Sequence, residues 1–397
     1  MRIAHAIERA WLSAGGTGAQ NYDEFADDAE ITAIIAANPH SALAVEMPHR
    51  APESQGRSLT QALPEAAARL AAAKSAGRYA QHERIAALYR ITGPEGTGYG
   101  VWTMVDTDQI STSADEPGLV IRNEDVFLEK VRERVALARA IGHLLSPVLL
   151  LQTGRGDELH EALARAAGGA GTPAVSDTDQ AGRTHEIWPL PPGPEQDGIL
   201  ALAGGGELVV ADGNHRSLAA QTAGLPRFLA VVTTPASVAI QPYNRLVAEL
   251  TLPAGDLLAR LAAAGAAVAP ARDIAVPAER GTVLLYTRDG GYAVRLPPDP
   301  AAPLVDNLDH ALVERVLLRD ALGLDAGDKR ITYVGGDYPA AWLRGEVDAG
   351  RAELAVLIAP VTVPDFVAVN LARQKLPRKS TWFTPKARAG LVVAELG

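Results

Sequence analysis

"ELVVADGNHRSLAAQ", residues 207–221, predicts a buried strand, a short polar turn and a helix in direct succession. The apolar run at 207–211 is typical of a strand that is covered on both faces. The helix that follows is expected to end at Gly224, and "RFLAVVTT" then predicts the next strand. A strand, a helix and a second strand in this order indicate an α/β fold.

The turn in the middle of this stretch, residues 212–216, carries groups suited to an anion. A glycine after a buried strand lets the backbone approach a ligand closely, and the first turn of a helix supplies N–H groups and the positive end of the helix dipole. Arg216 adds a forked cation that matches phosphate oxygens. The pattern therefore predicts a phosphate site. Asp212 fits such a site only if it holds a metal, takes a proton or orients a neighbour.

A simpler interpretation explains the same five residues. Asp212 or Asn214 caps the helix, and His215 and Arg216 lie on a solvated face. Short motifs often match by chance, so only the strand before the turn and the helix after it make the phosphate interpretation as good as this one. Both interpretations stay open.

A second group of charged residues is "RNEDVFLEKVRER", residues 122–134. It follows a predicted strand at 119–122, and we expect a helix to start near Asn123. Glu124 at this junction is a candidate general base, and Lys130 shares a helical face with a second cation four residues on. The alternative is a glutamate that favours the helix dipole beside a solvated charged face, and the residues alone favour that alternative.

The C-terminal stretch "LARQKLPRKSTWFTPKARAGLVV" is basic in an acidic protein. From Asn370 to Arg388 it contains six lysines and arginines and no acid. Such a stripe is typical either of a surface that faces an anionic ligand or of a solvated segment. Trp382 and Phe383 indicate that part of it packs against the protein.

Composition excludes several classes of function. The net charge of −10 disfavours general binding to nucleic acid, because an acidic protein repels the phosphate backbone. The absence of cysteine excludes disulfides, thiolate metal sites and cysteine nucleophiles, and the histidines lack the spacing of a structural zinc site. No apolar run approaches the ~20 residues that a membrane span needs. We therefore expect a cytoplasmic protein without a membrane partner, and a homo-oligomer is possible.

The chain of 397 residues exceeds a typical single domain, so we expect two lobes. The first, 1–249, contains the polar turn. The second, 250–397, begins where the pattern of predicted helices and strands changes. Both are predicted to be α/β with a mixed (α+β) sheet. Within the first lobe, 41–49 predicts a strand and 153–198, rich in glycine and proline, a mobile region.

Several segments, in order along nearly the whole chain, resemble a large bacterial and archaeal family labelled a domain of unknown function. They include "NPHSALAVEMPH" (38–49), "VIRNEDV" (120–126), "THEIW" (184–188), "VVADGNHRSLAA" (209–220) and "LPRKSTWFTPK" (376–386). More distantly, the DG-x-HR turn is similar to the nucleotide-phosphate motif of the ParB and sulfiredoxin-like fold. That fold includes ADP-dependent free-serine kinases, ATP-using sulfiredoxins and CTP-binding partition proteins.

The resemblance implies a ParB/sulfiredoxin-like nucleotide-binding core in the first lobe, with Mg²⁺ and ADP or ATP as cofactors. By position in the motif, Asp212 would lie near the transferring group or its Mg²⁺. The candidate catalytic residues are Glu124, Asp212 and His215. The candidate cofactor-binding residues are Gly213, Asn214, His215, Arg216, Arg122, Lys130, Lys379, Ser380 and Thr381.

The chain departs from the family pattern at two positions. Asn214 and Asn123 stand where the family has histidine. An amide can hydrogen-bond a ligand but does not transfer a proton, so these departures concern catalysis more than binding. The serine kinases use a glutamate to deprotonate the hydroxyl, and Glu124 is the candidate for that role here.

We expect a nucleotide-dependent phosphotransferase, a small-molecule kinase that acts on the hydroxyl of a metabolite such as free serine. Phosphoryl transfer mostly requires positioning and charge neutralisation, which the cations of these motifs and Mg²⁺ supply. The alternative is a nucleotide-binding switch or partition-like adaptor that turns over no metabolite. A third interpretation is a scaffold whose polar turn is only a helix cap.

Overall fold

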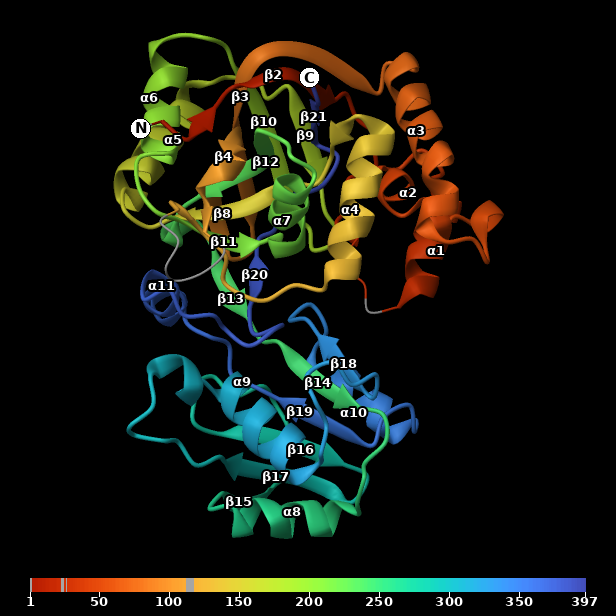
Figure 1. Ribbon diagram of the computed structural model, residues 1–397, viewed down its shortest axis with the longest axis vertical. Coiled ribbons are helices and arrows are strands. Elements are labelled where there is room, and N and C mark those ends of the chain that lie inside the picture. Colours follow the sequence, from red (N-terminus) through yellow and green to blue (C-terminus); the bar gives the residue numbers. More distant parts are fainter. Residues whose placement is uncertain (1, 23–24, 26, 112–117) are drawn as a thin grey trace. The chain divides into compact units, whose positions relative to one another are not determined.

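The protein is a mixed α/β structure, as expected from its sequence. The computed structural model shown in Figure 1 gives this architecture. The residues that it describes are 2–22, 25, 27–111 and 118–397. None of the helices described is long and apolar enough to cross a membrane.

Two compact units make up the chain. Residues 1–238 together with 385–397 form the first unit, and residues 239–384 form the second. This division differs from the expected one at 249/250. The reason lies in strand pairing, because strands between residues 239 and 247 pair within the second unit, whereas the last strand of the chain pairs with strands of the first.

One large mixed sheet organises the first unit. Its order is β5-β6-β11-β8-β12-β4-β3-β2-β21-β7, with β1 paired to β4, β10 to β3 and β9 to β10. Its strands are β1 Ala4–His5, β2 Ile7–Ser13, β3 Tyr79–Gly93, β4 Gly96–Asp106, β5 Ile110–Ser111, β6 Val120–Ile121, β7 His143–Leu144, β8 Val148–Gln152, β9 Val175–Thr178, β10 Thr184–Leu190, β11 Leu208–Asp212, β12 Arg227–Thr233 and β21 Val392–Glu395. The predicted strands at 119–122 and 207–211 are confirmed as β6 and β11, and the structure shows that the two strands are parallel neighbours.

Seven α-helices of the described residues belong to the first unit. They are α1 Asp28–Ala37, α2 Ala42–Glu46, α3 Leu59–Ser75, α4 Leu128–Ile141, α5 Gly156–Gly169, α6 Pro194–Ala203 and α7 Asn214–Thr222. Helix α4 packs against both α3 and α7 (Figure 1). Helix α3 begins with a capping box in which Ser58 and Gln61 each accept the other's backbone N–H.

Two expectations about the first unit are wrong. Residues 41–49 form helix α2 and a 3₁₀ turn instead of a strand. Ser41 caps α2 by accepting the Ala44 N–H. All five residues of this short helix are buried, so its apolar run shows no helical period. The segment 153–198, expected to be mobile, contains α5, β9, β10 and the start of α6.

The second unit is a six-stranded sheet of order β15-β17-β16-β19-β14-β18, with a separate pair β13-β20. The strands are β13 Ala239–Gln241, β14 Asn244–Val247, β15 Ala267–Ala271, β16 Val283–Thr287, β17 Gly290–Arg295, β18 Ile331–Val334, β19 Leu354–Leu357 and β20 Trp382–Thr384. The helices are α8 Ala254–Ala263, α9 Asp309–Leu312, the π-helix Val313–Ala321, α10 Ala340–Asp348 and α11 Val363–Leu371.

Both faces of this second sheet are covered. Along β19, Leu354 and Val356 belong to the core that includes residues of α8 and the π-helix. Ala355 and Leu357 belong to the core that includes residues of α10. Successive side chains of a strand point to opposite faces, so the helices form a layer on each side of the sheet.

The burial of His310 in α9 can be tested by measuring how the stability of the protein depends on pH. The residue is completely buried, its Nε2 lies 3.2 Å from the carbonyl oxygen of Tyr243, and desolvation lowers its pKa from 6.5 to about 3. The unfolded chain therefore binds a proton between these values that the folded protein excludes. The free energy of unfolding should fall as pH decreases through this window, by at most about 1.4 kcal/mol per pH unit for one histidine.

His310→Gln keeps a donor for the Tyr243 carbonyl but has no ring to titrate. Urea unfolding at about pH 7 and about pH 5 should show a smaller loss of stability for this variant than for the wild type. His40→Gln, at an exposed histidine, is the control and should behave as the wild type. Equal pH dependence in wild type and His310→Gln would contradict the assignment.

Candidate functional site

The site begins with the parallel pairing of β6 and β11. Val120 lies opposite Leu208 and Ile121 opposite Val209. Because neighbouring parallel strands end at the same edge of a sheet, the loop 122–127 and the turn after Asp212 emerge side by side. The two charged motifs of the sequence therefore meet in the first unit.

Gly213 makes the turn, with a left-handed φ of +98°. A Cβ at this position would lie 2.8 Å from Nε and 3.0 Å from Nη2 of Arg216, and 3.2 Å from the Cα of Val148. The guanidinium of Arg216 thus folds back over the N-terminus of its own helix and takes the space that a side chain would need. Glycine meets both requirements, the backbone conformation and the close approach.

Asp212 and Arg216 form an ion pair across this turn. Nη2 of Arg216 donates to Oδ2 of Asp212 over 2.5 Å, and the arginine side chain is largely buried. The sequence allows three roles for Asp212: to hold a metal, to take a proton or to orient a neighbour. In this structure Asp212 orients a neighbour, Arg216. The carboxylate holds the guanidinium at the end of the helix and balances its charge there.

Asn123 and Asn214, which stand where the resemblance implies histidine, are in direct contact. Nδ2 of Asn214 donates to Oδ1 of Asn123, and the residues are 4% and 1% exposed, respectively. Among the described residues, Oδ1 of Asn214 has no hydrogen-bond partner. A buried acceptor without a donor is costly, so this oxygen is a place where a ligand donor or a water would be stabilised.

His215 holds the loop against the helix. The backbone N–H of Phe127 donates to Nε2 of His215 over 3.0 Å, and the two rings are nearly parallel with centroids 6.1 Å apart. Nε2 of His215 is therefore the acceptor in this contact. His215 therefore has a positioning contact in addition to any contact with a ligand.

Helix α4 starts later than the sequence predicts. It begins at Leu128 after Phe127, without a side-chain cap, and not near Asn123. Glu124 lies in the loop and is half-buried, as is Arg122, while Lys130 is exposed in the first turn of α4. The contact between Phe127 and His215, which is distant in sequence, keeps residues 123–127 in the loop.

The predicted phosphate ligands Lys379, Ser380 and Thr381 belong to the second unit. Lys379 has a left-handed φ of +57°, and its Nζ lies 5.6 Å from the centre of the Tyr243 ring. Ser380 is buried and its hydroxyl donates to the carbonyl oxygen of Pro377, a local use that does not involve a ligand. The three residues remain predicted ligands.

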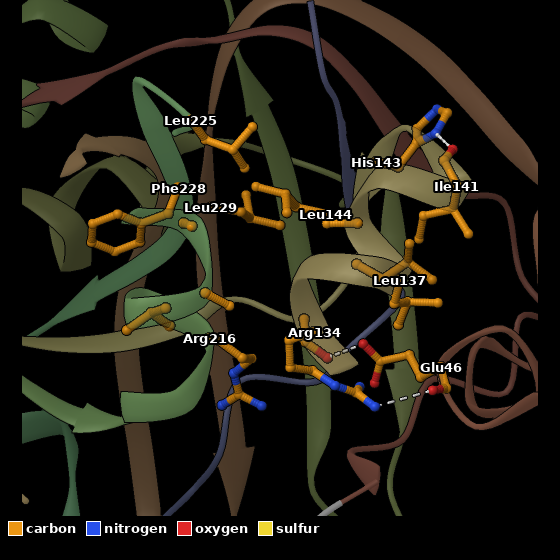
Figure 2. A pocket seen from close by; sticks show the side chains of 16 residues that line it. Glu46, Arg134, Leu137, Ile141, His143, Leu144, Arg216, Leu225, Phe228 and Leu229 are labelled. Carbon is orange, nitrogen blue, oxygen red and sulfur yellow. Dashed lines mark hydrogen bonds between the residues drawn. The ribbon is translucent and has the colours of Figure 1, made fainter. Parts of the chain in front are cut away.

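A pocket of about 540 Å³, including its open mouth, lies beside α7 in the first unit (Figure 2). Arg216 reaches its edge, so the pocket adjoins the polar turn. Most of its wall is apolar and comes from α4, α7 and the strands β7, β8 and β12. The lining residues with polar groups are Glu46, Arg134, His143, Ser146 and Arg216.

Most of the polar groups in this pocket are not predicted by the sequence patterns. Glu46 lies in the segment that was predicted as a strand, and it accepts a hydrogen bond from the hydroxyl of Ser146. Arg134 appears there only as part of a charged helical face. No local pattern could identify these residues, because Glu46 and Ser146 are one hundred residues apart in the chain.

The described residues contain no group of three histidine, aspartate, glutamate or cysteine side chains that could hold a metal ion. The site is therefore not a preformed metal centre as far as the structure describes it. Its potential ligands are hydrogen-bond donors and charges: a guanidinium, the N-terminus of α7 and a buried amide pair.

Gly213→Ala should lower the free energy of unfolding by more than Gly224→Ala at the other end of α7. Both glycines have left-handed φ, +98° and +71°, and alanine is strained there by ~1–2 kcal/mol. Only at Gly213 does the new Cβ also meet Arg216 and Val148, whereas nothing lies within 4 Å of one at Gly224. Urea unfolding measures both losses. Equal losses would show that Arg216 does not occupy this space in solution.

Solved structures with some similarity include a conserved hypothetical protein from Pyrococcus furiosus, at 14% identity and a TM-score of 0.40 over 73% of this chain and 95% of that one. A free serine kinase in complex with AMP matches at 13% identity and a TM-score of 0.41, over 73% and 92%. SbnI from Staphylococcus aureus, with a C-terminal truncation, matches at 10% identity and a TM-score of 0.38, over 73% and 87%.

No curated protein matches the chain. A family model does match, over residues 14–311, and its description is "Protein of unknown function (DUF1015)". The match spans three quarters of the chain and includes both the loop 122–127 and the turn 212–216. The chain belongs to this family.

Proposed function

We propose that the protein is a nucleotide-dependent phosphotransferase that acts on the hydroxyl of a small metabolite, with free serine as one candidate. The observation that supports this most strongly is the position of Arg216, whose guanidinium lies over Gly213 at the N-terminus of α7. A cation with several donors at the positive end of a helix is suited to a polyanion such as a nucleotide phosphate.

The phosphates of ADP or ATP would lie on the turn 212–216. They would accept hydrogen bonds from Arg216 and from N–H groups of the first turn of α7, while the φ of Gly213 lets them approach the backbone. Asp212 competes with a phosphate for the same guanidinium. Binding therefore exchanges one charged partner of Arg216 for another, so the guanidinium is not left buried and unpaired.

Glu124 is the candidate base, and it lies in the loop that contacts the turn. In the proposed step its carboxylate takes the proton of the acceptor hydroxyl. A bond forms between that oxygen and the terminal phosphorus, while the bridging P–O bond breaks and the nucleotide leaves one phosphate shorter. The amides of Asn123 and Asn214 do not titrate, so they serve to bind and not to move the proton.

Mg²⁺ fits this site only as a partner of the nucleotide. The ion usually keeps several waters and needs one or two carboxylates besides substrate phosphates. Asp212 is half-buried and ends β11, so it is the carboxylate proposed to hold the ion. The ion would neutralise charge on the transferring phosphoryl group.

A nucleotide-binding switch without turnover is the second candidate. The contact between Asn123 and Asn214 favours it, because a buried pair of amides replaces the two histidines of the family pattern. This function would keep nucleotide binding, lack phosphoryl transfer and couple binding to a change in assembly.

Nucleotide binding is tested first with calorimetric titration of ADP and ATP in the presence of Mg²⁺. Arg216→Gln should weaken binding by about 10-fold or more, since a charged hydrogen bond is lost. Arg132→Gln, at an exposed arginine of α4, is the matched control and should bind as the wild type. Equal affinity of wild type and Arg216→Gln would exclude the turn as the phosphate site.

Turnover is tested by incubation with nucleotide, Mg²⁺ and free serine, with phosphoserine as the readout. Glu124→Gln should reduce the rate by about 100-fold or more, as expected for a lost general base, and leave nucleotide affinity unchanged. In the absence of Mg²⁺, Asp212→Asn should bind nucleotide at least as tightly as the wild type, because Arg216 loses its competing carboxylate. Glu129→Gln is the control for Glu124→Gln. A full rate in Glu124→Gln would exclude it as the base.

A further inference from the structure

A second hollow of the first unit is formed by helix α1, the 3₁₀ turn Pro48–Arg50 and the start of helix α3. It measures about 750 Å³, including its open mouth, and shares no lining residue with the pocket beside α7. Both helices contact the 3₁₀ turn (Figure 1). A hollow of this size is large enough to hold a small ligand.

The lining of this hollow is polar and basic. Its side chains are those of His49, Arg50 and Arg57, together with Thr32, Gln55 and Ser58, and no acidic residue of the described chain lines it. Because the whole protein has a net charge of −10, a basic lining is a local feature and does not follow from composition. The hollow offers no apolar wall to an uncharged ligand and is suited to an anion.

The charges that act on His49 show that the electrostatic field at this ring is positive. Burial lowers the pKa of His49, and the charges of Arg50 and Arg134 lower it further, while Asp28 acts in the opposite direction. The ring is therefore neutral near pH 7, since its protonation would add a third positive charge beside two cations. An anion bound here would be attracted by the same cations.

Some donors in the hollow are not satisfied by the protein itself. Nδ1 of His49 and Nε of Arg50 are buried and have no hydrogen-bond partner among the described residues. A buried polar group without a partner is costly. A ligand that presents acceptor oxygens would remove this cost when the two side chains turn toward it.

The two arginines can be reached from solvent and keep donors to spare. Nη2 of Arg50 lies 2.5 Å from Oδ2 of Asp28, and Nη1 of Arg57 donates to Oε1 of Glu65 over 2.5 Å. The side chains of these arginines are 35% and 38% exposed, and ion pairs this exposed contribute little to stability. Because a guanidinium has five N–H donors, each arginine can bind a further anion without giving up its carboxylate.

We propose that this hollow binds a phosphoryl group, either free phosphate or the phosphate of a small phosphomonoester, on Arg50, Arg57 and His49. These donors come from two segments of the chain, and the tetrahedral oxygens of a phosphate can accept from several directions at once, whereas a carboxylate is planar. The site is separate from the turn 212–216, and the inference does not depend on the proposed function.

The test is calorimetric titration of the full-length protein without nucleotide, in about 0.15 M salt, which screens attraction to distant surface charges. Inorganic phosphate or glycerol 3-phosphate should bind with a Kd at or below about 5 mM, and acetate at least about 5-fold more weakly. Tighter binding of glycerol 3-phosphate would assign the site to a phosphorylated metabolite, and tighter binding of inorganic phosphate to the free ion. Acetate equal to phosphate, or no binding of either phosphate at about 20 mM, would overturn the proposal.

Variants of Gly56 locate the bound phosphate. This glycine lies in the wall of the hollow with a left-handed φ of +79°, and nothing lies within 4 Å of an added Cβ. Aspartate and asparagine both tolerate this conformation, so Gly56→Asp and Gly56→Asn differ mainly in charge. Gly56→Asp should weaken phosphate binding by about 10-fold or more through repulsion, and Gly56→Asn should bind as the wild type. Equal affinities of the two variants would contradict this location.

Arginine variants separate the hollow from the turn 212–216. Arg50→Gln should weaken phosphate binding by about 10-fold, whereas Arg216→Gln should still bind phosphate with a Kd at or below about 5 mM. Arg132→Gln, at an exposed arginine, should behave as the wild type. Phosphate binding that is lost in Arg216→Gln and kept in Arg50→Gln would overturn this inference. Absence of nucleotide binding with phosphate still bound in the hollow would contradict the proposed function and leave this inference standing.

Discussion

The parallel pairing of β6 with β11 is the constraint on which the site depends. Only two residue pairs make it, Val120 with Leu208 and Val209 with Ile121. They nevertheless bring together groups that are 91 residues apart, because Asn123 follows one strand and Asn214 the other. The apolar run of β11 buries the pairing, and both strands end at the edge of the sheet where the loop 122–127 meets the N-terminus of α7.

The turn after β11 then meets three requirements within residues 212–216. Gly213 adopts a conformation that other residues rarely adopt, and it leaves room for the guanidinium of Arg216. Asp212 holds that guanidinium in place and balances its charge. A cation that is already positioned and desolvated loses little side-chain entropy when an anion replaces its partner. The ion pair is therefore compatible with anion binding, although it lowers the affinity by the strength of the competing contact.

Local patterns were sufficient for the elements that contact the site directly. The strand β11 and the helix α7 follow from a buried apolar run and a turn, and both are confirmed. The start of α4 is not predictable from local sequence, because the backbone N–H of Phe127 donates to His215, a residue distant in the chain. Helix α2 was mistaken for a strand, since a short, fully buried apolar run has no period that distinguishes the two. Because the segment was interpreted as a strand, Glu46 was not identified as a residue of the pocket.

The boundary between the units and the contact between Asn123 and Asn214 also depend on long-range pairing. No composition change marks the return of Val392–Glu395 to the first unit, where this strand pairs with β2. The two motifs place the asparagines after separate strands, and only the β6–β11 pairing shows that they meet. Residue types in a motif thus predict the chemistry of the site, and the sheet determines which of them act together.

The central claim is that nucleotide phosphate lies at the turn 212–216. A crystal structure of the protein grown with ADP and Mg²⁺ tests it most directly. Phosphate oxygens should lie within hydrogen-bonding distance of Arg216 and of the first turn of α7, with the guanidinium moved away from Asp212. A nucleotide bound elsewhere, with Arg216 still paired to Asp212 as it is here, would show that the turn is not the phosphate site.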